Sequence, residues 1–235
     1  MNTVYCQRRK NTPEKVKRLL RQEAGFGCAS CGHPFLEYHH IIPYEKDQHF
    51  RPEDMVCLCG NCHTIFENLG YDLQYKVKKN PYNIKKGIMN GALKYDKRDL
   101  VFKVGGTQFI NTPTILQFRD LPIISCVLKE GQAKVSLNLL DQNGKIIFSV
   151  KENDITFLTD DIWDFKCAPN LVVVRRKLGE IALRMDFRKS EAFIHGHLWI
   201  NHQKLKLYPK KMILPGNNIM RGGVMSSNKV GIQIG

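Results

Sequence analysis

Two pairs of cysteines at C-x-x-C spacing restrict the fold of this chain more than any other feature of its sequence. They are Cys28 with Cys31, and Cys59 with Cys62. Each pair can bind one side of a tetrahedral ion through its thiolates, and four thiolates complete the coordination of Zn²⁺. The spacing therefore predicts a structural zinc ion with no open coordination position, which stabilises a region too small to bury much apolar core.

We favour zinc over disulfide bonds because the chain has no sign of export. Its N-terminus is basic but is not followed by an apolar run, so it does not resemble a secretory signal. No stretch approaches the ~18 apolar residues of a membrane-spanning helix. We expect a cytoplasmic protein with no membrane partner, in which the remaining cysteines are free thiols: Cys6, Cys57, Cys126 and Cys167.

The chain also carries a large positive charge, which favours a polyanionic partner. Its net charge is +14 at pH 7 over 235 residues, and DNA is the first candidate for such a partner. Two basic segments, residues 1–21 and 71–100, flank the cysteine pairs. The candidate DNA contacts in these segments are Arg8, Arg9, Lys10, Arg18, Lys76, Lys78, Lys79, Lys85 and Lys86.

Three histidines lie close to the cysteine pairs in sequence. His63 directly follows the last cysteine, and His39 and His40 lie between the two pairs. One interpretation is that they are ordinary polar residues beside a zinc ribbon. The other is that the closed zinc site holds three imidazoles in a small volume, which predicts a second metal site with open positions.

The segments CASCG, YHHIIP and PEDMVCLCGNCH, taken in this order, resemble the HNH endonucleases. The resemblance covers about residues 20–70 and is to the variant of the ββα-metal nuclease fold that carries a four-cysteine zinc. It implies a metal-dependent DNA endonuclease that hydrolyses phosphodiester bonds, either nicking one strand or cutting both. A double-strand cut would need a homodimer or two sequential nicks.

The resemblance also implies roles for individual residues. His40 would be the general base that activates water, and His39 and His63 would bind the catalytic divalent ion. Asp54, at the middle position of the family motif, is the second residue that the resemblance assigns to the catalytic site. It departs from the residue that usually braces the loop carrying the base. Glu67 is one helical turn after His63, either as a further ligand or as a solvated carboxylate.

The identity of the catalytic ion stays open at this level. Mg²⁺ prefers oxygen ligands, whereas imidazoles suit Mn²⁺, Ni²⁺, Co²⁺ or Zn²⁺ better. Nucleases of this type serve restriction, phage defence, mobile elements and phage packaging, and the sequence does not choose among these contexts.

The sequence pattern of the chain changes at about residue 100. Eleven short runs rich in β-branched and aromatic residues follow, separated by turn signals, which predicts an all-β domain, either a sandwich or a short β-solenoid. The predicted fold class is thus α+β. We expect a nuclease domain with a basic helix over residues 1–75, a basic helical linker over 76–100, and a β-rich domain over 101–235.

The role of the β-rich domain is not fixed by any motif. DNA recognition, dimerisation and binding of a partner are all open. Two other functions also stay open for the whole chain: a zinc-stapled DNA-binding module without catalysis, and a protein–protein module whose basic surface serves solubility.

Overall fold

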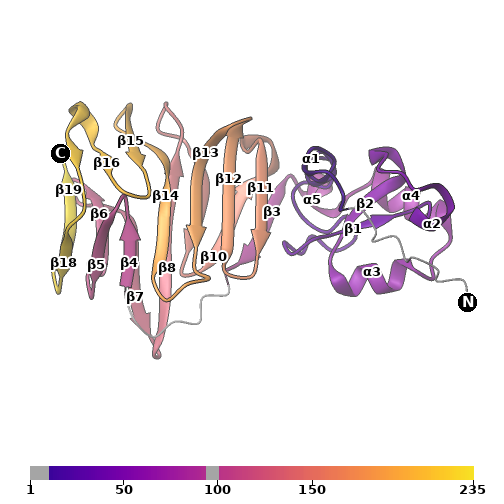
Figure 1. Ribbon diagram of the computed structural model, residues 1–235, viewed down its shortest axis with the longest axis horizontal. Coiled ribbons are helices and arrows are strands. Elements are labelled where there is room, and N and C mark those ends of the chain that lie inside the picture. The colour runs from indigo at the N-terminus through magenta and orange to yellow at the C-terminus, as the bar shows by residue number, and fades with distance from the viewer. Residues whose placement is uncertain (1–10, 94–100) are drawn as a thin grey trace, which may run out of the picture.

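The computed structural model describes residues 11–93 and 101–235, and Figure 1 shows a helical N-terminal part beside an elongated β-rich part. A small N-terminal domain followed by a β-rich region is the predicted fold class. None of the helices in the described ranges is long and apolar enough to cross a membrane. The N-terminal part contains α1 (Glu14–Glu23), β1 (Glu37–His40), α2 (Tyr44–Asp47), the 3₁₀ turn η1 (Pro52–Asp54), β2 (Met55–Leu58), α3 (Gly60–Phe66), α4 (Tyr71–Lys79) and α5 (Tyr82–Lys86).

Helix α1 forms where its local sequence favours a helix. It begins just after Pro13, with the acid Glu14 in its first turn, where it complements the helix dipole. Leu20 and Ala24 are buried on its inner side. Gly25 has a φ of +61°, a left-handed conformation that ends the helix at little cost for glycine.

A two-stranded sheet and helix α3 form the centre of the N-terminal part. Strands β1 and β2 pair antiparallel, with His40 opposite Met55 and His39 opposite Val56. Their apolar residues share a small core with α1, α3 and α4, in which Met55 and Leu58 are fully buried. This core is small, as expected for a domain that needs a metal to stabilise it.

The β-rich part consists of two sheets. A seven-stranded sheet has the order β19-β6-β7-β8-β9-β10-β3, and a ten-stranded sheet runs β11-β12-β13-β14-β15-β16-β17 with β4, β5 and β18 attached. Their bounds are β3 Ile88–Ala92, β4 Val101–Val104, β5 Thr107–Ile110, β6 Thr114–Phe118, β7 Leu121–Lys129, β8 Gln132–Leu140, β9 Ile146–Lys151, β10 Asp154–Leu158, β11 Asp164–Ala168, β12 Leu171–Lys177, β13 Glu180–Asp186, β14 Ala192–Ile200, β15 Gln203–Leu207, β16 Met212–Ile213, β17 Ile219–Met220, β18 Val224–Ser226 and β19 Val230–Ile234, with 3₁₀ turns Thr159–Asp161 and Pro215–Asn217.

The two sheets pack face to face around one apolar core. Buried side chains alternate with outward-facing ones along the strands, as in β14, and the inner side chains of both sheets form a single cluster. Most neighbouring strands pair antiparallel through hairpins, which is the sandwich alternative rather than the parallel coils of a solenoid. The C-terminal strands join these sheets: β18 pairs parallel with β5 and β19 with β6.

Residues 76–100, expected as a helical linker, contain more than helices. They include the end of α4, all of α5 and strand β3, which pairs antiparallel with β10 and so belongs to the seven-stranded sheet. Residues 94–100 lie outside the described ranges. The described end of this basic stretch, residues 88–92, is therefore a strand of the β-rich part and not a helix.

The two parts of the molecule contact each other through several segments. Phe26 contributes to the core of the β-rich part, and Phe35 forms a parallel bridge with Cys167 of β11. The side-chain amide of Gln22 donates to the carbonyl oxygen of Trp163 at 2.6 Å. Helix α1 and the zinc-binding loop are thus packed directly on one end of the sandwich.

Candidate metal centre and active site

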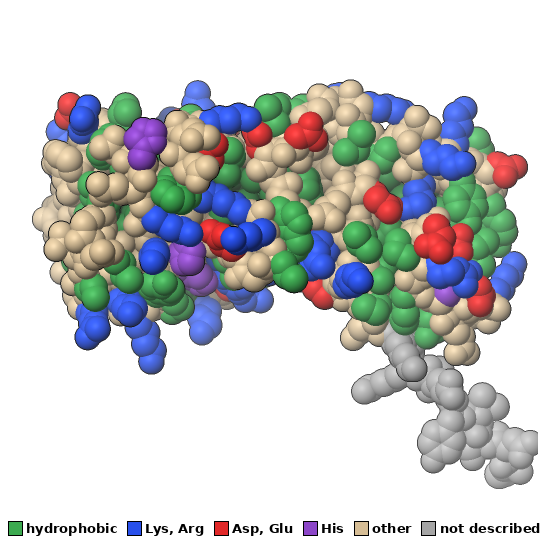
Figure 2. All heavy atoms as spheres, turned by 90° about the horizontal axis from the view of Figure 1, so that it is seen from above, with side chains coloured by type: hydrophobic (Ala, Val, Ile, Leu, Met, Phe, Trp, Pro, Cys, Tyr) green, Lys and Arg blue, Asp and Glu red, His purple; other side chains and the backbone are tan. Residues whose placement is uncertain are grey.

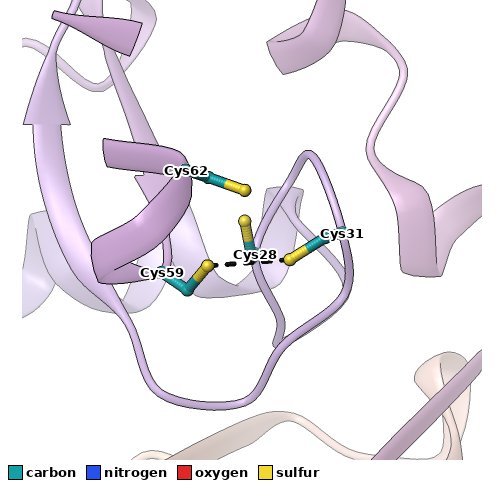
Figure 3. Close-up of side chains that lie close together, drawn as sticks. All are labelled: Cys28, Cys31, Cys59 and Cys62. Carbon is teal, nitrogen blue, oxygen red and sulfur yellow. Dashed lines mark hydrogen bonds between the residues drawn. The ribbon is translucent and has the colours of Figure 1, made fainter. Parts of the chain in front are cut away.

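The four cysteines predicted to bind zinc lie together. The sulfur atoms of Cys28, Cys31, Cys59 and Cys62 are all within 4.8 Å of one another, and Figure 3 shows them pointing toward a common centre. The sulfurs of Cys31 and Cys59 are 3.6 Å apart. Around a tetrahedral Zn²⁺ with Zn–S bonds of about 2.3 Å, neighbouring sulfurs lie about 3.8 Å apart. The cluster fits a closed zinc site.

Local backbone geometry brings the first cysteine pair into this position. The amide of Gly32 donates to the carbonyl oxygen of Cys28 at 2.8 Å, and the amide of Cys28 donates to that of His33 at 2.9 Å. Gly32 has a φ of +80°, and a Cβ atom there would lie 2.5 Å from Oδ1 of Asn83. Glycine is therefore required for the tight turn between Cys31 and the next strand.

The thiols of this cluster differ in their electrostatic environment. Burial raises the pKa of the Cys28 thiol far above its usual range, and hydrogen bonds from the backbones of Cys59 and Cys31 offset only part of that rise. Burial also raises the pKa of Cys62. Burial acts in the same direction on Cys59, but hydrogen bonds from the backbone of Cys62 and from the other cysteines outweigh it and lower the pKa of Cys59. Thiolates are the form that binds metal, so a divalent ion bound here would displace the protons of the remaining thiols.

The three histidines line one hollow beside the zinc cluster. His39 and His40 come from the end of β1, and His63 comes from α3 directly after Cys62. The hollow has a volume of about 310 Å³. Its lining residues are His39, His40, Ile41, Pro43, Tyr44, Glu45, His63, Phe66, Glu67, Leu69, Tyr71 and Gln74.

His39 is held in one tautomer by Gln74. The side-chain amide nitrogen of Gln74 is 3.0 Å from the carbonyl oxygen of Phe66 and 2.7 Å from that of Leu69, which fixes the orientation of the amide. Its Oε1 then faces Nε2 of His39 at 3.0 Å. Because a carbonyl oxygen only accepts, Nε2 of His39 carries the proton and Nδ1 has the lone pair.

His63 has the matching arrangement on the other side of the hollow. Its Nδ1 is 3.5 Å from Oε1 of Glu67 and 3.9 Å from Oε2 of Glu37. Carboxylates beside Nδ1 favour a proton on that nitrogen and a lone pair on Nε2. Nε2 of His63 lies 3.4 Å from Nδ1 of His39, so the two lone pairs face each other.

This pair of nitrogens fits a divalent ion. Metal–nitrogen bonds to imidazole are about 2.0–2.1 Å long, so two imidazoles on one tetrahedral ion place their nitrogens about 3.4 Å apart. The observed separation of His39 and His63 equals this value. Glu67 lines the same hollow, and its carboxylate is 59% exposed, so it can reach either the ion or solvent.

His40 contacts the loop after β1. Its Nε2 is 3.0 Å from the carbonyl oxygen of His49, so Nε2 carries the proton and Nδ1 has the lone pair. The rings of Tyr44 and Phe50 pack against it, with centroids at 5.5 and 5.8 Å. The loop is itself closed by His49, whose Nε2 is 3.0 Å from the carbonyl oxygen of Ile42.

Asp54 supports this loop with its backbone. The amide of Ile41, next to His40, donates to the carbonyl oxygen of Asp54 at 2.8 Å. Its carboxylate accepts from Nε of Arg51 at 2.8 Å and from the hydroxyl of Tyr75 at 2.7 Å, and these bonds lower the pKa of Asp54. Asp54 is not among the lining residues of the hollow.

The candidate DNA contacts are spread over several environments. Arg8, Arg9 and Lys10 lie outside the described residues. Arg18 stacks on the ring of Trp163 at 4.7 Å, and Lys78 pairs with Glu23. Lys86 donates to the hydroxyl of Tyr82 at 2.6 Å. The remaining candidates are exposed on α4 and α5: Lys76, Lys79 and Lys85.

Sequence reasoning did not find Gln74, His49 or the contribution of Glu37. Gln74 is 3% exposed, and a buried glutamine in a basic amphipathic helix has no local signal that points to a histidine partner. His49 follows His40 by nine positions in a polar loop, where its burial could not be foreseen. Glu37 precedes the histidine doublet on an exposed position of β1.

Comparison with known proteins agrees with the arrangement of the N-terminal part. A family model described as HNH endonuclease matches residues 28–68, which contain both cysteine pairs and all three histidines of the hollow. No curated protein matches the chain, and no solved structure does. An HNH domain with a four-cysteine site is typical of nucleases and nucleic-acid-binding proteins. By this match and by its clustered cysteines, the chain contains an HNH endonuclease domain at residues 28–68.

Proposed function

We propose that this protein is a metal-dependent DNA endonuclease that hydrolyses phosphodiester bonds in the hollow between β1, α3 and α4. The observation that carries the proposal is the pair of imidazole nitrogens of His39 and His63, 3.4 Å apart, beside His40 in the same hollow. Phosphodiester hydrolysis needs a nucleophile and neutralisation of charge at phosphorus. His40 would activate water as the nucleophile, and a divalent ion held by His39 and His63 would neutralise the charge.

His39 and His63 would hold the catalytic ion, with Glu67 as a third candidate ligand. The ion would neutralise charge on the scissile phosphate and on the leaving oxygen. The ligands suit Mn²⁺, Ni²⁺, Co²⁺ or Zn²⁺, and Mg²⁺ remains a candidate if carboxylate and phosphate oxygens complete the sphere. Gln74 keeps the imidazole of His39 in the tautomer that binds an ion. Glu67 does the same for His63, and Glu37 would take over that contact if Glu67 bound the ion instead.

His40 would act as the general base. The lone pair on its Nδ1 can take a proton from water, since a neutral imidazole is a competent base near pH 7. The bond from its Nε2–H to the carbonyl oxygen of His49 holds the ring in place and stabilises the imidazolium that forms. In this scheme Asp54 has a bracing role through its carbonyl oxygen to Ile41 rather than a direct part in proton transfer.

The four-cysteine site would be structural. Its thiolates fill the coordination of Zn²⁺, and it joins the loop of Cys28 and Cys31 to the start of α3. Because His63 directly follows Cys62, the position of this metal-binding histidine depends on the zinc site. The candidate phosphate contacts are exposed lysines of α4 and α5: Lys76, Lys79 and Lys85.

A plasmid assay tests this proposal. Supercoiled DNA is incubated with the zinc-loaded protein and each divalent ion in turn, and we expect nicked or linear product with at least one ion. His40→Ala should lower the cleavage rate by about 10²-fold or more, the usual contribution of a general base. His202→Asn, in an exposed hairpin of the β-rich part, is the matched control and should cleave normally.

The main alternative is a DNA-binding module without catalysis. It predicts tight, salt-sensitive binding with no product in any ion, and identical behaviour of the His40→Ala and wild-type proteins. Intact plasmid under all conditions would exclude the nuclease. Product analysis would then separate nicking from double-strand cutting, and sedimentation of the protein would test the homodimer that a concerted double cut requires.

A further inference from the structure

The outer surface of the ten-stranded sheet has an unusual composition along its central strand. In β14 the residues from Ala192 to Ile200 alternate between buried and half-exposed positions. The half-exposed set faces away from the core and contains only aromatic and imidazole side chains: Phe193, His195, His197 and Trp199. We call the outer surface around these residues the basic sheet face.

Each of these outward residues has a basic neighbour in register on the next strand. His195 is opposite Arg184, and His197 is opposite Lys206. Trp199 is opposite Lys204 and Phe193 is beside Lys103. Residues opposite each other in a sheet have Cβ atoms about 5 Å apart on one face. The strand therefore presents rings and cations as adjacent pairs.

The cations on this face are held close to the rings. Nζ of Lys204 is 5.7 Å from the ring centre of Trp199, and Nζ of Lys211 is 5.6 Å from that of Tyr208. Nζ of Lys103 is 5.9 Å from the ring of Phe193. Cations and aromatic planes side by side are the combination that proteins use to bind a nucleic-acid strand without regard to sequence.

The carboxylates on this face do not cancel its charge. Asp186 is bonded to both Arg184 and Arg188, and Glu180 to Lys204 and Lys177. Among the residues that the structure describes, no carboxylate lies within ion-pair distance of four further lysines around the face: Lys103, Lys189, Lys206 and Lys211. These lysines can therefore neutralise an external anion.

The face also has an unsatisfied polar atom. Nδ1 of His197 is buried and has no hydrogen-bond partner within the described part of the chain. Buried polar atoms normally have a partner, but this nitrogen is shielded from solvent, so a ligand on the face would meet the half-exposed remainder of the ring. The ring of His197 packs edge-on against Tyr208, with centroids 5.7 Å apart, which fixes its direction.

The opposite surface of the sandwich is different. The outward residues of the seven-stranded sheet include a row of small neutral side chains, with Ser125 opposite Ser136 and Thr156 between Ser149 and Asn90. Its outward lysines lack aromatic partners in register, since Lys134 is opposite Val127 and Lys151 is opposite Asp154. The pairing of cations with rings is therefore a feature of β14 and its neighbours. Figure 2, seen from above, shows Lys and Arg side chains projecting from the lower left edge of the β-rich part.

We propose that the basic sheet face is a second nucleic-acid-binding surface, which holds the phosphate backbone of DNA outside the nuclease domain. Lys103, Lys189, Lys206 and Lys211 contact phosphates, and the rings of β14 contact exposed base or sugar surface. The position of the face supports this role, because the helical part packs on β11 at the end of the same sheet. This surface is independent of whether the hollow at His40 cleaves DNA.

Anisotropy of labelled DNA tests the proposal. Binding is measured in the His40→Ala background, so that cleavage does not interfere, with duplex and single-stranded DNA of equal length. The double variant Lys103→Gln/Lys206→Gln should raise Kd about tenfold or more. Each lost phosphate contact should also reduce the slope of log K against log salt by about 0.9 for duplex and about 0.7 for single strands.

The matched control removes the same charge from the other face. Lys134→Gln/Lys151→Gln changes outward lysines of β8 and β9, and it should leave Kd and the salt slope almost unchanged. A loss on only one form of DNA supports the proposal and identifies which form is bound. Equal behaviour of the two double variants, with folding of both verified by circular dichroism, would overturn it. Plasmid cleavage is measured separately, so a failure of the proposed nuclease activity would not be mistaken for a failure of this surface.

Discussion

The guanidinium of Arg21 and the carboxylate of Asp164 form a two-pronged salt bridge between the two parts of the molecule. Nε of Arg21 is 2.9 Å from Oδ1 of Asp164 and Nη2 is 3.0 Å from Oδ2, and the side chains are 1% and 2% exposed. Nη1 of Arg21 also donates to the hydroxyl of Tyr38 at 2.7 Å. Tyr38 directly precedes the histidine doublet, so the strand that carries the active-site candidates is tied through α1 to strand β11.

This salt bridge predicts a large loss of stability when one partner is removed. Asp164→Asn leaves the buried guanidinium of Arg21 with only the largely exposed carboxylate of Glu14, 3.0 Å away, as counter-charge. We expect unfolding to become easier by about 3 kcal/mol, the lower end of the usual cost of breaking a buried ion pair. Urea denaturation followed by tryptophan fluorescence measures this, because Trp163 is adjacent. Asp47→Asn, whose partner Arg51 is exposed, is the control and should cost at most about 1 kcal/mol. Similar losses for both variants would contradict the role of burial.

Gln74 should control the affinity for the ion in the hollow. Gln74→Leu removes the acceptor that keeps the proton on Nε2 of His39, so Nδ1 is no longer fixed as the metal-binding atom. We expect the zinc-loaded protein to bind Mn²⁺ or Ni²⁺ 10–100-fold more weakly by calorimetry, the usual effect of losing an outer partner of a ligand.

The glutamine variant needs a control for damage to the helix. Gln74→Leu also leaves the carbonyl oxygens of Phe66 and Leu69 without a donor, which destabilises α4 on its own. Gln74→Glu keeps an acceptor for His39 but loses both donors, so it suffers the same structural damage. If Gln74→Glu binds the ion as weakly as Gln74→Leu, fixing the tautomer is not what Gln74 contributes.

Loss of the zinc site should unfold the N-terminal part selectively. In Cys31→Ser only three thiols remain to bind zinc, and the small core around Met55 loses the stabilisation that the metal provides. We expect the variant to be purified without stoichiometric zinc, with helical signal lost and sheet signal retained. Cys167→Ser, a half-buried thiol of β11, is the control and should keep its zinc. Retention of zinc by Cys31→Ser would show that another group replaces this ligand.

Much of the β-rich part could be predicted because its strands have a local alternation of apolar and polar residues. The alternation in Ala192–Ile200 and similar runs places a buried face and a solvent face at a period of two, which is what β14 adopts. Strand β3 was missed because it lies inside a basic stretch that suits helices and contains Gly91. Strands β18 and β19 have no such local signal, because each is stabilised by parallel pairing with a strand more than a hundred positions earlier in the chain.

The candidate site likewise contains one part that could be predicted from local sequence and one part that could not. The clustering of the four cysteines follows the spacing of the two pairs, since C-x-x-C turns form from neighbouring residues. The supporting residues depend on how helices dock: Gln74 is 35 positions from His39, and Asp164 is 143 positions from Arg21. No periodicity within α1 distinguishes Arg21, which becomes buried, from Arg18, which stays at the surface of the junction. Burial of a charged side chain is set by a partner that local sequence does not reveal.

We expect the Asp54→Asn substitution to change the cleavage rate little and to change the stability of the fold in a pH-dependent way. Because the brace to Ile41 comes from its carbonyl oxygen, Asp54→Asn should keep cleavage within a few-fold of wild type, whereas a direct catalytic role requires a loss closer to that of His40→Ala.

The hydrogen bonds from Arg51 and then Tyr75 lower the pKa of Asp54 in the folded state. Its ionised form therefore stabilises the fold at pH values above the ordinary aspartate pKa of about 3.9, and this contribution is lost as the pH falls through the lowered value. Urea denaturation of both proteins should show wild type more stable by about 1 kcal/mol or less at neutral pH, with the difference shrinking as the pH falls below about 4. A gap that stays constant down to the lowest pH would mean that the charge of Asp54 is not what stabilises this loop.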